Sequence, residues 1–185
     1  MHAPPSGMRR GICLGRRVAC GNLRQRETVL DLVERALRRH ALLEETRDAG
    51  MVSARLHDVG LLVISDLIRL KPGPLDASEW EIIRTHPVVG ALILEALEFP
   101  WPVRPAVRHH HERWDGSGYP DGLMGEEIPL GARIIAVADS FDAATSDRAY
   151  RQAKDRQDVL TEITASAGIR YDRQVVHALV EALAE

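Results

Sequence analysis

The stretch "LGARIIAVADSFDAATS", residues 130–146, sets the expectation for the fold. Its apolar residues recur at helical spacing, which predicts a helix with one buried face. The core candidates on that face are Ile134, Ile135, Val137, Ala138 and Phe141. Asp139 stands inside the same apolar run, where a lone ionised carboxylate is costly unless it is paired or bound to metal. The stretch therefore predicts a core helix that also carries a chemically active group.

Helical patterns continue on both sides of this stretch. An amphipathic pattern begins at Arg24, and a turn-rich loop is expected from Asp115 to Pro129. Further helices are expected at about 44–59, 103–113, 155–167 and 172–184. The strand signal is poor throughout. The chain is therefore interpreted as an all-α bundle.

A further helix has a recognisable start. Asp76 is a plausible N-cap, and Glu79, three residues later, completes a capping box. Pro87 is expected to kink this helix just after His86, because proline disfavours helical geometry in the residue before it.

Composition narrows the function classes. The chain has 185 residues, which suits one domain with a sizeable core, and a net charge of −3, which does not favour broad binding to DNA or anionic membranes. No apolar run approaches the ~20 residues that span a bilayer. Residues 1–23 are expected to be a weakly ordered segment, not a convincing signal peptide, and residues 24–185 to form the domain. Cys13 and Cys20 match no zinc or redox spacing, and a cytoplasmic location is expected.

Several predicted helices place ionisable residues where a core is expected. These residues are His57, Asp58, His86, His110, His111 and Asp139. Imidazole mixed with carboxylate suits Fe, Mn, Co, Ni or Zn. Neighbouring helical residues diverge by about 100°, so His110 and His111 reach one site only if it is broad or holds more than one metal. A carboxylate such as Asp58 can bridge two ions, and two ions sharing a hydroxide favour phosphoester hydrolysis.

Each of these residues also has an ordinary explanation. A His-Asp dipeptide is a weak signal by itself. His86 could be a partly buried helix residue, Asp139 a satisfied core carboxylate, and the histidine triplet 109–111 a solvated surface. All of these explanations would have to hold at once, which favours the shared metal site.

Longer motifs point to a family. They are "HDVG", "THPVVGALIL", "HHERWDGSGYPDGL", "IPLGARIIAVADSFDAATSDRAYR" and "GIRYDRQVV". From about Arg24 to the end, the sequence resembles the HD-GYP domain, a subgroup of the HD metal-dependent phosphohydrolases. The resemblance implies an HD-type helical bundle around an interior metal centre. It also implies hydrolysis of the bacterial second messenger cyclic di-GMP to pGpG or GMP.

The resemblance implies a role for each matching position. His57, Asp58, His86, His110, His111 and Asp139 are the implied metal ligands, and Asp58 is the implied bridge and catalytic residue. Two divalent transition metals are expected, Fe or Mn first, with Ni, Co or Zn as alternatives. Glu112 after the histidine pair selects His110 and His111, which leaves His109 as a solvated or packing neighbour.

Downstream residues resemble the family's substrate-recognition strip. Asp142 lies one helical turn from Asp139, and Arg148 and Arg151 match basic positions that contact the dinucleotide. Arginine suits phosphate and guanine through paired donors, although a solvated helix end is the ordinary alternative. Tyr119 belongs to the signature Gly-Tyr-Pro, a turn that presents a ring to a base or a partner. The resemblance implies contacts with GGDEF-type synthase domains there.

Two positions depart from the family pattern. Leu61 stands where the family has a lysine that faces the substrate phosphate, and leucine can neither donate a hydrogen bond nor neutralise an oxyanion. The family's upstream histidine would fall near Gln25, with Gly21 one turn before, and neither is a good ligand. Glu27 and His40 are near but out of register, so a three-metal centre with its full ligand set is not expected.

Three hypotheses follow. The favoured one is an active cyclic di-GMP phosphodiesterase with a two-metal site, because six ligands survive. The second is a degenerate domain that binds the nucleotide or a partner with little hydrolysis. The third is a related phosphohydrolase for another nucleotide, such as a mixed cyclic dinucleotide. The sequence leaves the oligomeric state, the native metal and the choice between pGpG and GMP open.

Overall fold

The computed structural model describes residues 31–34, 44–147 and 152–183. Within these ranges the regular elements are helices, and β-pairing is limited to two isolated bridges, so the all-α expectation is confirmed. The elements are α2 (Glu44–Leu56), η1 (Val59–Val63), α3 (Asp66–Arg69), α4 (Ala77–Ile83), α5 (His86–Ile93), η2 (Leu94–Ala96), α6 (Val103–His109), η3 (Gly125–Glu127), α7 (Leu130–Thr145), α8 (Arg156–Ala165) and α9 (Arg173–Leu183). No helix in those ranges has both the length and the apolar surface needed to cross a bilayer.

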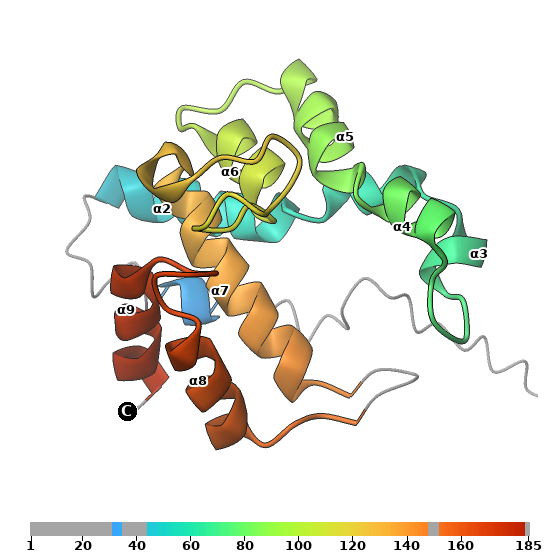
Figure 1. Ribbon diagram of the computed structural model, residues 1–185. Coiled ribbons are helices and arrows are strands. Elements are labelled where there is room, and N and C mark those ends of the chain that lie inside the picture. The colour runs from blue at the N-terminus through green and yellow to red at the C-terminus, as the bar shows by residue number, and fades with distance from the viewer. Residues whose placement is uncertain (1–30, 35–43, 148–151, 184–185) are drawn as a thin grey trace, which may run out of the picture.

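Helix α7 is the centre of the bundle. It packs against α2, α6, α8 and α9, and Figure 1 shows it in orange running through the middle of the molecule. All five predicted core residues of α7 are buried. They join a cluster to which α8 contributes Val159 and Ile163 and α9 contributes Val176 and Leu179. Burial of this apolar face, at about 25 cal/mol per Å², is what holds α7 in place.

The chain ends are described only in part. Residues 31–34 are helical, and Leu32 and Val33 are buried in the same cluster as α7, as the amphipathic pattern from Arg24 predicts. The predicted segment 1–23, with its two cysteines, lies outside the described residues. The terminal helix pair is confirmed to within two or three residues by α8 and α9.

A second, smaller cluster joins the helices on the other side of α7. Leu94, Val103 and Val107 are its buried members, and residues of α2 and η1 pack against them. Helix α5 contacts both η1 and α6, and α6 also contacts α2 and α7. This cluster therefore fixes the positions of α2, α5 and α6 relative to α7.

Gly60 sets the spacing between η1 and α5. A Cβ atom there would overlap the carbonyl oxygen of His86 and would lie 2.6 Å from the backbone nitrogen of Gly90. Only glycine allows the two backbones to approach this closely. The close approach brings Asp58, two residues earlier, against the start of α5 and its His86.

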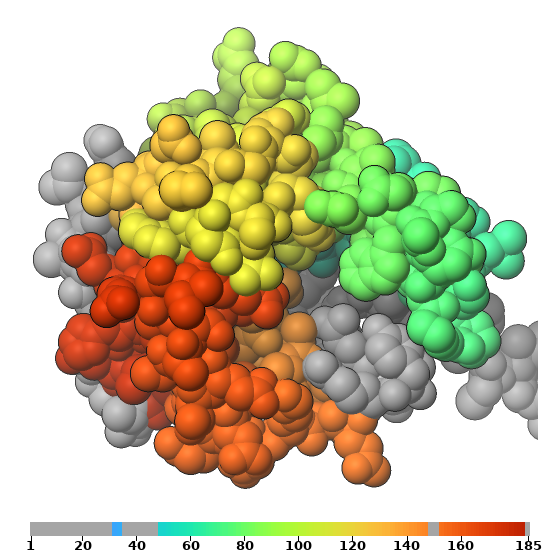
Figure 2. All heavy atoms as spheres, viewed as in Figure 1, coloured from blue at the N-terminus to red at the C-terminus, as the bar shows by residue number. Residues whose placement is uncertain are grey.

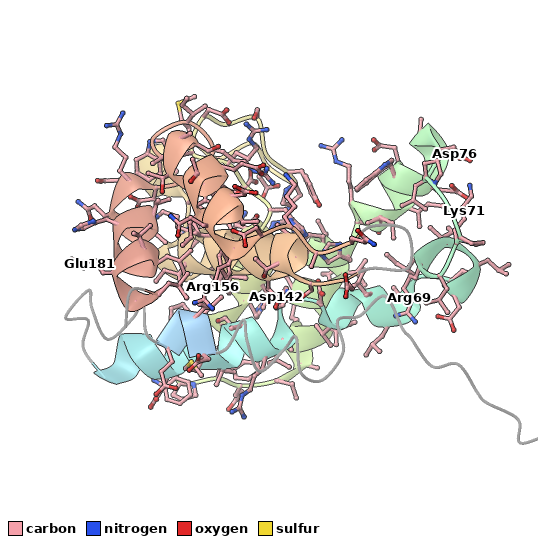
Figure 3. All side chains as sticks on the ribbon, turned by 90° about the horizontal axis from the view of Figure 1, so that it is seen from below. Arg69, Lys71, Asp76, Asp142, Arg156 and Glu181 are labelled. Atoms are coloured by element: carbon pink, nitrogen blue, oxygen red, sulfur yellow. The ribbon has the colours of Figure 1, made fainter. Side chains whose placement is uncertain are left out.

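Helices α3 and α4 form an arm that projects from the bundle (Figures 1 and 3). The predicted capping box starts α4: the Asp76 carboxylate accepts from the Glu79 N–H at 2.9 Å, and the Glu79 carboxylate accepts from the Asp76 N–H at 2.8 Å. Lys71 also donates to Glu79, at 2.6 Å. Figure 3 shows Lys71 and Asp76 on the arm and Asp142 in the body of the bundle.

Three helix boundaries differ from the predictions. The helix at Pro87 is not kinked but divided: α4 ends at Ile83, and Pro87 lies in the first turn of α5, where its missing N–H is tolerated. Helix α2 ends at Leu56 because the chain tightens into the 3-10 turns of η1 as it meets α5. Helix α6 ends at His109, not Arg113, because Glu112 turns inward and accepts hydrogen bonds from the next loop.

Candidate metal centre

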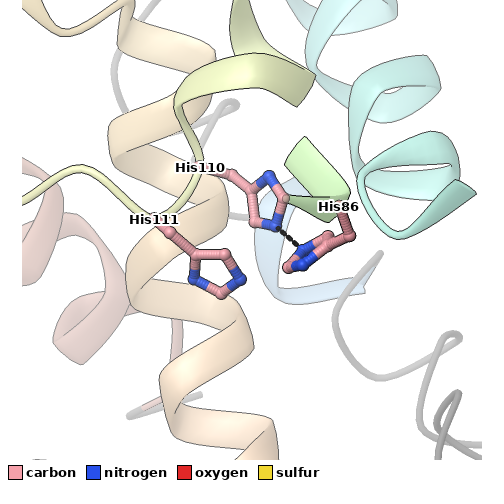
Figure 4. Close-up of side chains that lie close together, drawn as sticks. All are labelled: His86, His110 and His111. Carbon is pink, nitrogen blue, oxygen red and sulfur yellow. Dashed lines mark hydrogen bonds between the residues drawn. The ribbon is translucent and has the colours of Figure 1, made fainter. Parts of the chain in front are cut away.

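The six predicted metal ligands converge from four parts of the bundle. His57 and Asp58 follow α2, His86 begins α5, His110 and His111 follow α6, and Asp139 lies on α7. His86, His110 and His111 each offer a ring nitrogen within 4.8 Å of the others. Figure 4 shows these three side chains pointing toward one another, with the Nε2 atoms of His86 and His110 3.2 Å apart. The predicted convergence of these helices is therefore present in the fold.

Backbone carbonyls orient three of the imidazoles in the same way. The Nδ1 atom of His57 lies 2.8 Å from the carbonyl oxygen of Ala54. The Nδ1 atoms of His86 and His110 lie 2.8 and 2.7 Å from the carbonyl oxygens three residues before them. If each Nδ1 carries the proton and donates it, Nε2 keeps a lone pair that faces the shared interior. This is the arrangement by which outer hydrogen bonds prepare histidine for metal binding.

Burial lowers the pKa of three of the predicted histidine ligands. Desolvation lowers the pKa of His86 from its usual value. It lowers the pKa of His110 further, with the neighbouring histidines adding to the effect. Desolvation and then the charge of His86 lower the pKa of His111 to about 3. A metal ligand must be the neutral imidazole, so near pH 7 protons compete little with a cation.

Asp58 lies between two groups of donors. Its Oδ2 is 3.5 Å from Nε2 of His57. Its Oδ1 is 3.5 Å from Nε2 of His86 and 4.0 Å from Nε2 of His110. The Oδ1 of Asp139 is 3.9 Å from Nε2 of His57, on the Oδ2 side of Asp58. One carboxylate thus turns one oxygen toward each group, which is the geometry of a bridging ligand.

A pocket of about 630 Å³ opens beside His110 and His111. Its walls come from α4, from the loop with residues 117–119 and from the turn at residues 170–171. The ring of Tyr119 stacks on His111 at 4.9 Å between centroids and 27° between planes. Burial raises the pKa of the Tyr119 phenol, so it stays protonated. The Tyr119 ring of the Gly-Tyr-Pro turn therefore lies directly against His111, a proposed ligand.

Comparison with known proteins gives the family. A family model described as "HD domain" matches residues 14–175. This chain belongs to the HD domain family. The predicted resemblance to HD-GYP domains is confirmed by this match together with relatives that are named cyclic di-GMP phosphodiesterases.

Relatives with curated names share this region. Over 144 residues this HD domain is 43% identical to the cyclic di-GMP phosphodiesterase response regulator RpfG of Xanthomonas campestris pv. campestris. The matched region is 77% of this chain and 38% of that protein. Over 150 residues it is 37% identical to the 3'3'-cGAMP-specific phosphodiesterase 2 of Vibrio cholerae. That matched region is 80% of this chain and 29% of that protein. The chain thus spans about a third of the length of these relatives.

A solved structure supports the fold. An HDG"Y"P protein from Bdellovibrio bacteriovorus superposes with a TM-score of 0.70, covering 87% of this chain and 52% of that chain. The two sequences are 16% identical in this superposition, so the likeness concerns the fold alone.

Of the predicted substrate-binding residues Asp142, Arg148 and Arg151, the structure describes only Asp142. Asp142 lies one turn beyond Asp139 on α7, but it is buried, with its Oδ1 3.5 Å from the Ser146 hydroxyl, and it does not line the pocket. Its expected contact with substrate therefore has no support from the pocket, because the Asp142 side chain lies inside the bundle. Arg148 and Arg151 lie outside the described residues, as does the position near Gln25.

Glu112 is a functional candidate that the sequence pattern indicates only as context for the histidine pair. Its buried Oε1 accepts from the backbone N–H groups of Asp121 and Gly122, at 2.7 and 3.0 Å. The segment 115–122 is thereby fastened to the end of α6. A charged residue directly after two ligands was the available signal, but its burial could not be read from the pattern.

His109 lies beside this fastening, and its buried Nδ1 has no hydrogen-bond partner among the described residues. Its Nδ1 is 3.7 Å from Oε1 of Glu112 and 3.5 Å from Oδ2 of Asp121. Both oxygens of Asp121 already accept from Arg108 at 2.8 Å. These three acceptors are therefore committed to holding the loop, and His109 is the packing neighbour that the resemblance implied.

Proposed function

We propose that this chain is a metal-dependent phosphodiesterase that hydrolyses cyclic di-GMP to pGpG, GMP or both. The observation that carries the proposal is the position of Asp58, with one carboxylate oxygen facing each group of donors. The similarity to phosphodiesterases of cyclic dinucleotides supports this substrate class. The donors are imidazole and carboxylate, which suit Fe or Mn and also Ni, Co or Zn.

The proposed ligands divide between two cations. His86, His110 and His111 would hold one, and His57 and Asp139 the other, with Asp58 shared. Two bound divalent cations would supply an activated water and would neutralise charge on the phosphoryl oxygens. The backbone bonds of His57, His86 and His110 keep these rings oriented, and the surrounding core excludes bulk water from their inner side. Tyr119 closes the edge of the site over His111.

The test starts with metal and turnover. Purified protein loaded with Mn or Fe is expected to convert cyclic di-GMP to pGpG, and elemental analysis is expected to give about two metals per chain. Asp58→Ala is expected to abolish turnover and to lower the metal content, because it removes the shared ligand. Asp66→Ala on the exposed arm is the control carboxylate. Full turnover by Asp58→Ala would contradict the proposal.

A second candidate function is nucleotide binding with little hydrolysis. Leu61 favours it, because the side chain at this family lysine position brings no charge, and its backbone carbonyl is occupied by Arg69 at 3.2 Å. Binding of cyclic di-GMP without turnover under Mn, Fe and Ni would support this second function. Leu61→Lys is expected to raise kcat if the missing lysine limits the rate. An unchanged kcat would remove Leu61 as the explanation for low activity.

The expected contact with GGDEF-type domains through the Gly-Tyr-Pro turn remains a prediction. So does the cytoplasmic location.

A further inference from the structure

The pocket beside the metal centre is larger than one phosphate needs. Its volume of about 630 Å³ is in the range of sites for whole small molecules, about 300–1,000 Å³. His110 and His111 form the part that adjoins the metal centre. The remaining lining includes side chains that the proposed mechanism does not use, among them Trp80, Arg84 and Arg170.

The α4 wall presents an aromatic surface and a cation. Trp80 is 51% exposed although it lines the pocket, so much of its indole is free to contact a ligand. Arg84, the residue that caps the end of α4, lies one turn after Trp80. Aromatic surfaces stack on nucleic-acid bases, and guanidinium groups bind phosphate through paired donors.

Arg84 is held in the pocket by the signature loop. Its guanidinium carbon lies 4.7 Å from the centre of the Tyr119 ring, and that ring stacks on His111 at 4.9 Å. Three planar groups thus form a column from α4 to the metal centre. The ion pair of Arg84 with Glu81 is long, at 3.4 Å, and Glu81 is 74% exposed, so it competes weakly for the guanidinium.

A second cation lies on another wall. Arg170 is exposed, lines the pocket and lies over the ring of Tyr171 at 5.1 Å. Its charge reaches His111, where it contributes to lowering the pKa. Figure 2 shows the loop atoms, in yellow, between the green atoms of α4 and the red atoms that follow α8. Cationic groups therefore reach this pocket from both α4 and the turn at residue 170.

We propose that this pocket binds the half of the cyclic dinucleotide that is not being cleaved, with Trp80 stacking on its purine base and Arg84 binding its phosphate. The inference rests on the proposed phosphodiesterase function. A cyclic dinucleotide has two phosphates, so when one lies at the metal centre the other must be held elsewhere. Arg84 is linked to the metal centre through Tyr119 and His111, which sets the distance between the two phosphate positions.

Arg84→Ala tests the phosphate contact. It is expected to raise the KM and the Kd for cyclic di-GMP by about tenfold, the size of one charge-assisted contact, with little change in kcat. Arg84→Lys is expected to recover part of the affinity, because it restores the charge without the planar fork. Arg104→Ala is the matched control: its side chain is 46% exposed against 43% for Arg84, and it also pairs with one glutamate.

A small substrate separates this inference from the proposed function. Bis(4-nitrophenyl) phosphate has one phosphodiester and no second phosphate, so Arg84→Ala is expected to raise the KM for it much less than the KM for cyclic di-GMP. Failure of the metal-loaded wild type to hydrolyse either substrate would overturn the proposed function. Cyclic di-GMP binding by Arg84→Ala as tight as by the wild type and by Arg104→Ala would overturn the phosphate assignment, whether or not turnover occurs.

Tryptophan fluorescence tests the base contact. Cyclic di-GMP is expected to quench the emission of the wild type, and Trp80→Phe is expected to lose that quenching while retaining most of the affinity. Quenching that persists in Trp80→Phe would come from Trp101 or Trp114 and would overturn the role of Trp80. A Trp80→Ala variant that folds and binds cyclic di-GMP with wild-type affinity would also overturn it.

Discussion

At the residue scale, Glu112 links two parts of the site that the sequence separates. It follows the proposed ligands His110 and His111, and its Oε1 accepts hydrogen bonds from the backbone N–H groups of Asp121 and Gly122. Gly118 packs so closely on the backbone of Glu112 and Arg113 that a Cβ atom there would overlap it. The position of Tyr119, next to Gly118, therefore depends on Glu112.

Glu112→Ala is expected to loosen this loop. Two hydrogen bonds to a buried carboxylate are lost, which is expected to lower the free energy of unfolding by ~2–4 kcal/mol and to raise the KM for cyclic di-GMP, because Tyr119 is no longer held on His111. Glu112→Gln keeps an acceptor at Oε1 and is expected to stay close to the wild type. Chemical denaturation and steady-state kinetics measure the two effects. Equal behaviour of the Ala and Gln variants would show that Oε1 does not hold the loop.

At the scale of elements, periodicity predicted most of the helices but not their ends. The apolar face of α7 was fully readable, because Ile134, Val137 and Phe141 repeat at helical spacing and all are buried. The division between α4 and α5 could not be predicted from the sequence, because proline at position 87 is equally consistent with a kink and with a first helical turn. Tertiary contacts, not local preference, chose between the two.

The candidate site, too, could be predicted from the sequence only in part. The convergence of the six proposed ligands could be predicted, because ionisable residues in apolar helices need a partner and the motifs named their positions. The pocket wall of Trp80, Arg84 and Arg170 could not, because Arg170 lies far from the other two in the sequence and each alone resembles an ordinary surface residue. The contact of Asp142 with substrate stays a prediction, since one helical turn from Asp139 does not fix which residue is buried, and Asp142 is buried.

The contact of η1 with α5 gives an element-scale prediction. Gly60→Ala is expected to force the two backbones apart, because the added Cβ overlaps the His86 carbonyl, a backbone atom that cannot move alone. Overpacking of this kind costs about 1–3 kcal/mol. The shift is also expected to weaken metal binding, since Asp58 and His86 are displaced from each other. Thermal unfolding with and without added Mn measures both effects.

Gly131→Ala is the control for this prediction. Its added Cβ would approach only the Cβ of Ala106, at 3.1 Å, which is a side-chain atom and not the backbone of a proposed ligand. It is expected to change stability modestly and to leave metal affinity unchanged. Normal metal affinity in Gly60→Ala would contradict the role assigned to the close approach.

At the scale of the whole molecule, the buried histidines make the metal-free protein sensitive to acid. Burial lowers the pKa of His86, His110 and His111 below the usual 6.5, so the unfolded chain takes up protons before the folded one does. Stability is therefore present above about pH 6.5 and is lost as the pH falls. Each such histidine contributes a slope of at most about 1.4 kcal/mol per pH unit.

Denaturation of metal-free protein between pH 7 and pH 5 measures this slope. The window lies above the usual values of 3.8 and 4.5 for the carboxylates, so the histidines dominate it. His111→Asn is expected to flatten the slope. His177→Asn is the control, because His177 is 75% exposed. A slope that is the same in both variants would show that His111 does not titrate in this window.

The bonds from Nδ1 of His57, His86 and His110 to the carbonyls three residues before them also bear on the speed of metal uptake. A site whose ligands must first be gathered binds slowly, because each encounter waits for the protein to rearrange. Here the rings already face the interior, so these side chains lost their conformational freedom when the chain folded and not when the metal binds. Association is then limited by how fast the cation sheds its own water, and fast-exchanging ions such as Mn²⁺ should enter sooner than slow-exchanging ions such as Ni²⁺.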